Sequence, residues 1–439
     1  MLESDSAPPM DSDTDSVFTQ WDRRGAGQAK QTHMFLGLSS AEMARGAPEV
    51  IEFLEDGDAL RFDDPALVDG DGTPAPIIGA RRIAYELALR RAIERYRKIT
   101  IRSSSTIVGL TSRAGTPPQI TGVKLVDGEE ITADLVVDCA GRRSMAHKWL
   151  VGAGSRNVPE QRQTCGFTYL TRWYRLREGA TFPAIPPPAS TRMSYMAVIA
   201  CPADRGWLSV TISLSEKDPF RSQLRNAQRF DQIVTAVPVA AAFVECTVAA
   251  TEPLPFGNIA NQRRSLVDED GPLVRGYLLV GDSSMHTNPT MGRGTSLAFA
   301  QARHLAASLT KTEAARADLI VGEEEWASGK LRIWFDSQVS ADASLADRFD
   351  RLATGEPLAE ADKASRTRGA LIAAAREDPE VGRDVRRMAN LLLTPAELMT
   401  KPAVQWALGD RLQKDCAWPE YDDALPRGEF ERLLTPPAK

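Results

Sequence analysis

The sequence has 439 residues and a formal net charge of -6 at pH 7. This length is enough for a deep core and for two to three domains. The negative charge and the lack of a long Lys/Arg block argue against general nucleic-acid binding. No apolar stretch approaches the ~20 residues of a membrane span, and the first residues lack the pattern of a secretion signal. We therefore expect a cytoplasmic protein with no membrane span.

The five cysteines and four histidines are scattered along the chain. No CxxC pair is present, and a chain of this length needs no disulfide framework. Cysteines in this pattern are typical of reduced core residues. The scattered histidines argue against a structural metal site. We expect no bound metal.

The N-terminal half alternates between helical and extended patterns. Residues 3–16 are acidic and rich in Pro and Ser, which predicts an exposed segment. Apolar residues spaced along Arg81–Arg97 predict a helix, and Ile99–Ile101 a short strand. From Ile120 the chain alternates, turns at Asp127-Gly128 and returns as a hairpin. The second arm of the hairpin continues into 135–137, which we expect to be more deeply buried.

The sequence pattern changes twice in the second half of the chain. Short β-rich runs from Cys165 to about Pro255 predict an antiparallel sheet with one exposed face. Beyond Phe335 almost every pattern is helical. An α/β domain with a β insertion and a helical tail follows from these patterns.

One stretch between these regions predicts a ligand site. Tyr277–Val280 is an apolar run that ends at Gly281-Asp282, as a buried parallel strand does. Two glycines, Gly292 and Gly294, then precede Thr295-Ser296, which we take as the N-cap of the next helix. Bare N–H groups and the positive end of a helix dipole would meet there. Such a place suits an electron-rich ring or a developing anion.

Two motifs resemble a known family. They are the middle motif, "ADLVVDCAGRRS" (133–144), and the late motif, "GDSSMHTNPTMGRGTSLA" (281–298), each of which follows a strand. They resemble the FAD-dependent oxidoreductases of the para-hydroxybenzoate hydroxylase fold, the group A flavin monooxygenases. The stretches "QAKQTHMFLG", "RRIAYELALRRA" and "GFTYLTRWYRLREG" are similar to a bacterial, epoxidase-like branch.

The resemblance implies an FAD/NAD(P)-binding, Rossmann-like α/β domain with a mostly parallel sheet. It also implies an inserted antiparallel β substrate domain and C-terminal helices. The expected ranges are 1–150 and 265–345 for the FAD-binding domain, 151–264 for the substrate domain and 346–439 for the helical region.

The resemblance also assigns cofactor contacts. Asp282, in the Gly281-Asp282 pair, would bind the ribityl chain, and Pro289 would lie beside the isoalloxazine. Gly292 and Gly294 would let the next helix approach the flavin pyrimidine edge. The remaining positions are Arg82, near the ribityl or phosphate groups, Lys30, where relatives often carry arginine, and Glu3, where the ribose-binding acid ends a strand. From its charged neighbours alone, Arg82 is equally consistent with a solvated helix face.

The sequence departs from the family in three places. The family's opening strand and GxGxxG turn are missing, so we expect that about 30 residues are absent before Met1. A start codon assigned too late and a truncated relative are both consistent with this gap. Lys30 keeps a charge but not the planar fork of arginine. Ala140 replaces an aspartate of the middle motif, which weakens the case for NAD(P)H binding on this chain.

The resemblance implies monooxygenation of a small apolar molecule, by hydroxylation or epoxidation through a flavin hydroperoxide. NAD(P)H is a candidate electron donor, directly or through a separate flavin reductase. The resemblance assigns no catalytic side chain. Two alternatives stay open: a flavin-dependent reductase of the geranylgeranyl reductase-like type, and a truncated, non-catalytic relative that does not bind flavin.

Overall fold

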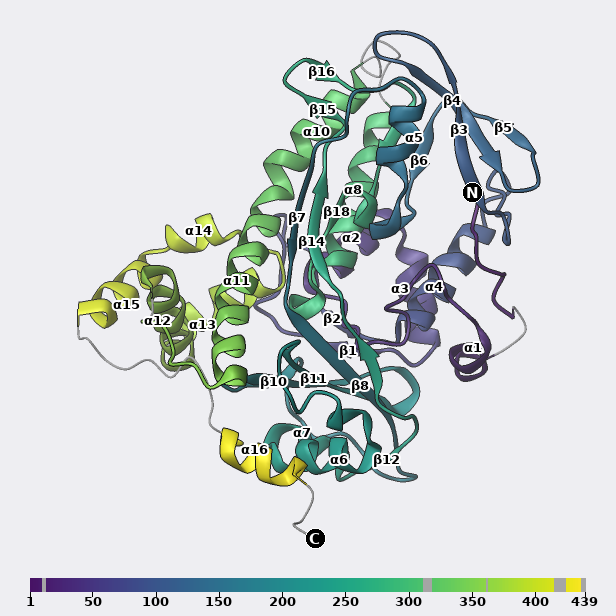
Figure 1. Ribbon diagram of the computed structural model, residues 1–439. Helices are drawn as coiled ribbons and strands as arrows, with labels where there is room; N and C mark the ends of the chain where they lie inside the picture. The colour runs from purple at the N-terminus through teal and green to yellow at the C-terminus, as the bar shows by residue number, and fades with distance from the viewer. Residues whose placement is uncertain (10–12, 311–317, 361, 414–423, 436–439) are drawn as a thin grey trace.

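The computed structural model describes residues 1–9, 13–310, 318–360, 362–413 and 424–435. An antiparallel sheet lies at one end of the molecule (Figure 1), and the order of its strands is β12-β8-β11-β10-β9, with β13 also paired to β8. The strands are β8 (Phe167–Leu176), β9 (Ala189–Arg192), β10 (Met196–Pro202), β11 (Trp207–Ser215), β12 (Thr247–Ala249) and β13 (Leu254–Phe256). The predicted antiparallel insertion is therefore confirmed.

The prediction that one face of this sheet is exposed is wrong. Every residue of β11 is buried, including those that point to opposite faces. Helices α6 (Ala227–Ala236), α7 (Pro238–Val244) and α16 (Arg427–Leu434) pack their apolar side chains in the core on one face. On the other side, Phe18 of α1 (Thr14–Gln20) contacts the rings of Trp173 and Trp207. Both faces of the sheet are therefore covered by apolar packing.

The remaining α/β part contains one parallel strand pair, β6 (Val136–Asp138) with β17 (Tyr277–Leu279). Isolated parallel bridges join Leu2 to Arg102 and Gln119 to Arg275. We expected a mostly parallel sheet, but within the described ranges parallel pairing is confined to these places. The predicted strand at 99–101 is likewise reduced to the bridge at Arg102.

The predicted hairpin forms. It consists of β4 (Gln119–Leu125) and β5 (Glu130–Thr132), and β3 (Ile107–Arg113) pairs with the other edge of β4. The prediction that 135–137 is deeply buried is wrong, because Val137 is 39% exposed. Strand β6 pairs with β17 on one side, and in the described part of the chain no strand pairs along its other edge. Cys139, which follows β6, is exposed as well, whereas Cys165 and Cys201 are buried as expected.

Helices cover this part of the chain. The predicted helix at 81–97 is α4 (Arg82–Glu94), which packs against α3 (Pro48–Asp56). The helix that begins within 281–298 is α8 (Gly294–Leu309), and α2 (Gly37–Gly46) packs against it. The other elements here are β1 (Leu60–Phe62), β2 (Ile77–Gly79), α5 (Ala146–Gly152), β15 (Val267–Asp268) and β16 (Gly271–Pro272).

Two strands connect the two parts. Strand β7 (Glu160–Thr164) pairs with β14 (Ala260–Arg264), which also pairs with β18 (Met285–His286). Figure 1 shows β7 and β14 running from the neighbourhood of α5 to β8. Residues on these strands therefore lie between the α/β part and the antiparallel sheet.

The C-terminal region is helical, as predicted, and contains α10 (Leu319–Lys330), α11 (Arg332–Thr354), α12 (Lys363–Glu377), α13 (Pro379–Ala389), α14 (Pro395–Met399) and α15 (Pro402–Gln413). Helix α11 continues through residue 345, so the structure shows no break at that expected boundary. Helix α16 packs on the antiparallel sheet rather than with α12–α15 (Figure 1). No described helix is long and apolar enough to cross a membrane.

Candidate functional site

The turn after β17 is built on a glycine. Gly281 has φ +64°, a left-handed conformation that glycine adopts without steric cost. Its N–H donates to Oε1 of Gln301 in α8 at 2.9 Å, which ties the turn to that helix. The next side chain, Asp282, is 28% exposed, so its carboxylate remains accessible beside the start of α8.

The loop before α8 contains another glycine with a left-handed backbone conformation. Pro289 begins a single 3-10 turn, 289–291, and Gly292 ends that turn with φ +63°. Helix α8 then begins at Gly294, so the predicted N-cap pair at Thr295-Ser296 is wrong. The helix starts before these two residues, and no side chain caps its first N–H groups. The hydroxyl of Ser296 is buried without a hydrogen-bond partner among the described residues.

The turn and the loop meet at Asp282. A Cβ atom added to Gly294 would lie 3.8 Å from Oδ1 of Asp282, and one added to Gly141 would lie 3.8 Å from its Cβ. A carboxylate, an uncapped helix start and the middle motif thus share one place. Because side chains are absent at both glycines, a ligand could approach the backbone here.

Arg82 faces the same place from the start of α4. Its side chain is only 21% exposed, which argues against the solvated-face interpretation. Its Nε donates to Oε1 of Glu86 at 2.7 Å. Burial opposes the charge of Arg82, but Glu86, Tyr85 and Asp282 outweigh this effect and raise the pKa of its guanidinium. Arg82 therefore stays charged within the electrostatic reach of Asp282.

Glu3 is linked to Arg82 by a chain of ion pairs. Its Oε2 lies 3.1 Å from Nη1 of Arg23, and Nε of Arg23 lies 2.7 Å from Oε2 of Glu86. Arg23 also pairs with Asp5, which is 8% exposed. The expectation of an exposed segment at 3–16 is therefore wrong for Asp5, because a buried arginine holds it.

Lys30 has different surroundings. Its Nζ lies 5.9 Å from the centre of the Phe18 ring, and its carbonyl accepts from Nε1 of Trp173 at 2.8 Å. These contacts belong to the packing around α1. The structure thus places Gly294 and Arg82 near Asp282 and links Glu3 to Arg82 through ion pairs. Gly281 and Gly292 shape the two adjoining turns, and Lys30 has other contacts.

Asp138 is a site residue that sequence reasoning missed. It is 8% exposed and accepts from the hydroxyls of Tyr277 and Ser144, both at 2.5 Å, and of Ser283 at 3.1 Å. Tyr277 and Ser283 flank the Gly281-Asp282 turn, so Asp138 holds the middle motif against the late motif. The charged partners of Arg82 were also missed. Glu86, one helical turn along α4, offered a local signal, whereas Arg23 offered none.

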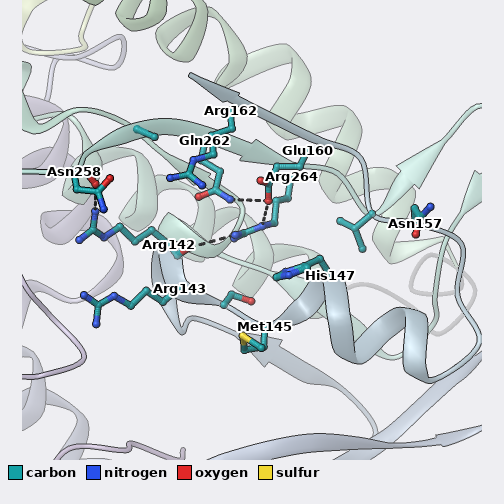
Figure 2. Close-up of a pocket in the computed structure, with 13 residues that line it drawn as sticks. Arg142, Arg143, Met145, His147, Asn157, Glu160, Arg162, Asn258, Gln262 and Arg264 are labelled. Atoms are coloured by element: carbon teal, nitrogen blue, oxygen red, sulfur yellow. Dashed lines mark hydrogen bonds and ion pairs between the residues drawn. The ribbon is translucent and has the colours of Figure 1, made fainter. Parts of the chain in front are cut away.

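A cavity lies beside the middle motif. Figure 2 shows it between the segment after β6 and the strands β7 and β14, with several arginine side chains around it. None of Glu3, Lys30, Arg82, Asp282 or the glycines of the late motif lines this cavity.

FAD is the group that the sequence resemblance implies, and the first of these two places fits it. The uncapped start of α8 offers N–H donors and a positive dipole end to an electron-rich ring edge. Asp282 offers an accessible acceptor, and Arg82 a charged donor. No group of His, Cys, Asp and Glu side chains that could hold a metal ion is found among the described residues.

Several solved structures share the fold of this chain. The flavin-dependent brominase Bmp2 superposes with a TM-score of 0.54 at 12% identity, over 88% of this chain and 89% of that chain. PqsL, a probable FAD-dependent monooxygenase from Pseudomonas aeruginosa, gives 0.52 at 15% identity over 74% and 89%. The Diels-Alderase PyrE3 of pyrroindomycin biosynthesis gives 0.52 at 16% identity over 89% and 74%. The chain therefore has the group A FAD-dependent monooxygenase fold, as the resemblance predicted.

Comparison by sequence adds one relative. Protein Rv3254 of Mycobacterium tuberculosis is 26% identical over 237 residues, which are 52% of this chain and 47% of that protein. The chain thus matches about half the length of this curated relative. No family model matches the sequence.

Proposed function

We propose that this protein binds FAD and transfers one oxygen atom from dioxygen to a small apolar molecule. The observation that carries the proposal is the position of Asp282, whose Oδ1 lies 3.8 Å from the Cβ position of Gly294 at an uncapped helix start. The fold supports it, because solved proteins of this fold include a flavin-dependent brominase and a probable FAD-dependent monooxygenase.

Each residue of the site has a proposed task. Asp282 accepts hydrogen bonds from the hydroxyls of the ribityl chain. The first N–H groups of α8, with the helix dipole, stabilise negative charge on the ring edge. Arg82 binds phosphate or ribityl oxygens, and Glu3 binds the adenosine ribose. When bound, reduced flavin supplies the electrons that activate dioxygen.

The substrate, in this proposal, lies between the antiparallel sheet and the loop that carries Pro289. The sheet touches this loop directly, because Tyr169 of β8 donates its hydroxyl hydrogen to Oδ1 of Asn288 at 2.5 Å. A substrate held there would be shielded from water by both parts of the chain.

The proposed electron source is NAD(P)H acting through a separate flavin reductase. Ala140 carries no side-chain acceptor, and its N–H is already bound by Oδ1 of Asp138 at 2.7 Å. A reductase that delivers reduced flavin would not need a nicotinamide contact at this position.

Cofactor binding is tested first. The protein is expressed both as given and extended by any in-frame codons upstream, and the absorbance of oxidised flavin is recorded after reconstitution with FAD. Binding is expected, and Asp282→Ala should lower the affinity on the order of tenfold, the effect of losing one hydrogen bond to a buried ligand. Asp336→Ala, at an exposed site on α11, is the control. A protein that stays colourless in both forms would instead support the non-catalytic alternative.

The reaction is tested with isotope-labelled dioxygen. Reduced flavin, the reconstituted protein and a panel of apolar small molecules are incubated, and the products are analysed by mass spectrometry. Incorporation of one labelled oxygen atom supports monooxygenation. A product that has gained two hydrogens without consuming oxygen contradicts it and supports the reductase alternative.

A further inference from the structure

Two neighbouring cavities lie along helix α11. The outer cavity has a volume of about 440 Å³, within the range of small-molecule sites, and its walls come from α11, the start of α12 and residues 358–360. The inner cavity has about 20 Å³, enough for a single water molecule, and lies between α11, Arg192 of β9 and the turn that begins at Pro289. Ser344 and Arg368 line both cavities, so the two spaces share one wall.

The position of this wall follows from the helical spacing of α11. Ala341 and Leu345 face the inner cavity, whereas Ala343 and Asp347 face the outer one. At 3.6 residues per turn, Ser344 lies at the boundary between these two faces of the helix. The side chain of Ser344 therefore stands between the two cavities.

Three polar side chains form the wall. Nη2 of Arg368 donates to Oγ of Ser344 at 2.9 Å and to Oγ of Ser365 at 3.2 Å, and the two serine hydroxyls lie 3.1 Å apart. Ser344 belongs to α11, whereas Ser365 and Arg368 belong to α12. The wall is thus a hydrogen-bonded contact between side chains of two helices, and rotation of the Arg368 side chain would open it.

The apolar packing of α12 is directed away from this contact. Ala370 and Ala374 share a core with Val381 of α13 and Leu408 of α15, and no described residue of α11 belongs to that core. Separation of hydroxyl and guanidinium groups exposes little apolar surface, and water replaces the hydrogen bonds that are lost. The wall can therefore open at a small cost in free energy.

The inner cavity ends at the loop that carries Pro289. Thr290 and Met291 line it, and Oγ1 of Thr290 accepts from Nε2 of Gln338 at 3.0 Å, which ties the turn to α11. In the proposed function, the substrate lies beside this loop. A passage that ends here therefore ends where the reaction is proposed to occur.

We propose that the substrate enters between α11 and α12 through these two cavities, and that Arg368 opens and closes the passage. The structure shows the closed state, because the inner cavity has room for one water molecule whereas small-molecule sites start at about 300 Å³. Withdrawal of the Arg368 side chain joins the two cavities. Arg368 thus limits the size of the molecules that reach the Pro289 loop. The identity of the passenger as substrate rests on the proposed function, whereas the passage itself requires no flavin.

Thiol labelling measures access to the inner cavity without flavin or substrate. Ala341→Cys places a thiol on the wall of this cavity, and modification of the peptide that contains it is followed by mass spectrometry. Iodoacetamide is the small reagent, and N-(1-pyrenyl)maleimide is the bulky one. Each rate is divided by the rate in the urea-unfolded protein, which removes the difference in intrinsic reactivity. We expect the folded protein to label slowly, and the bulky reagent to be the more strongly hindered of the two.

Two further substitutions in this background should move the rates in opposite directions. Arg368→Ala removes the side chain that closes the wall and should raise labelling on the order of tenfold, and more for the bulky reagent, because two hydrogen bonds no longer hold the wall shut. Ala343→Trp fills the outer cavity and should lower both rates on the order of tenfold, because a large ring there leaves no space for the reagent. Arg376→Ala, exposed on α12 and lining neither cavity, is the control and should stay within about twofold.

Ser344→Ala provides an independent test if Arg368→Ala does not fold. It removes the hydroxyl that Arg368 binds across the two helices and keeps a similar volume, so labelling should rise, though less than in Arg368→Ala. The proposal is overturned if none of these variants changes the labelling rate while far-UV circular dichroism and thermal transitions show folded proteins. Equal acceleration of both reagents also overturns it, because a passage limited by the Arg368 side chain must hinder the larger reagent more.

Saturating FAD separates this passage from the flavin site. Labelling of the Ala341→Cys protein should not change when FAD is added, because the reagent enters between α11 and α12 and not past the start of α8. Loss of labelling with FAD would overturn the proposal, since it would show entry from the flavin side. If the protein binds no FAD but labelling depends on Arg368 as expected, only the proposed function fails.

Discussion

Nε of Arg82 lies 2.7 Å from Oε1 of Glu86, one turn further along the same helix. The other oxygen of Glu86 lies 2.7 Å from Nε of Arg23. One carboxylate thus orients two guanidinium groups, one toward Asp282 and one toward Glu3. Burial raises the pKa of Glu86, but the two arginines outweigh this effect and keep its pKa below the usual value. The proposed ends of the cofactor site are therefore coupled through a single buried acid.

Replacement of this acid should cost stability. Glu86→Gln removes a charge between two partly buried guanidinium groups, and we expect the free energy of unfolding to fall by about 3 kcal/mol. Urea denaturation measures the change. Glu94→Gln, on the same helix but 43% exposed and 3.7 Å from Arg90, is the matched control and should cost under about 0.5 kcal/mol. A loss of similar size in both variants would show that Glu86 has no special role.

Gly294→Ala separates a structural role of this glycine from a role in ligand binding. Without a ligand the new Cβ makes only an ordinary contact with Asp282 at 3.8 Å, and alanine favours helix by up to about 1 kcal/mol over glycine. The unfolding free energy should therefore stay constant or rise. Flavin affinity should fall on the order of tenfold, because the methyl group occupies the approach to the N–H groups of α8.

Gly322→Ala is the control for this variant. It makes the same substitution inside α10, where a Cβ would contact nothing within 4 Å. It should raise stability without changing flavin affinity. If Gly294→Ala also leaves the affinity unchanged, the ring does not bind at the start of α8.

The sequence predicts the local part of this site. An apolar run that ends in Gly281 announces a strand and its turn, and both Gly281 and Gly292 have the left-handed backbone that glycine permits. Helix α8 begins earlier than predicted. Thr295 and Ser296 match N-cap preferences, but Gly294 already has helical geometry. Preferences of single residues cannot decide between starts two or three residues apart.

The contacts that organise the site could not be predicted. Arg23 and Glu86 are 63 residues apart, and Asp138 and Tyr277 are 139 residues apart. Nothing in the local pattern selects these partners, because charged and hydroxyl side chains have many candidates along the chain. The exposure of Val137 depends on which strands flank β6, and that is a property of the whole sheet. Fold class and motifs were therefore accessible from the sequence, whereas side-chain networks were not.

His33 should make stability depend on pH. Burial, and then the charge of Arg82, lower its pKa from 6.5 to about 4. Since the unfolded chain binds a proton more readily between these values, the contribution of His33 is present above about pH 6.5 and is lost as the pH falls toward 4. The loss is on the order of 2 kcal/mol, measured by urea denaturation across this range.

A variant comparison isolates this contribution from other titrating groups. His33→Gln should show a smaller decrease in stability on acidification than the wild type. His147→Gln, at an exposed position of α5, should keep the wild-type decrease. The assignment to His33 fails if its variant and the wild type lose stability in parallel.

Asp342 of α11 should stabilise the loop before α8. It is 3% exposed and accepts from the side-chain amides of Asn261 at 2.8 Å, Asn288 at 3.0 Å and Gln338 at 2.9 Å. Burial raises the pKa of this carboxyl, although the three amide donors oppose the shift. The residue therefore joins β14, the loop that precedes Pro289 and its own helix.

Asp342→Ala leaves these three amide donors without their acceptor, and we expect a loss of about 3 kcal/mol in unfolding free energy. Asp342→Asn keeps one acceptor oxygen at similar volume and should lose less. Asp347→Ala, which removes an exposed pair with Arg351 on the same helix, should cost under about 0.5 kcal/mol. Because Asn288 accepts from Tyr169 and leads into Pro289, the alanine variant should also bind FAD more weakly. Unchanged flavin affinity in a destabilised Asp342→Ala protein would mean that this network supports the fold but not the site.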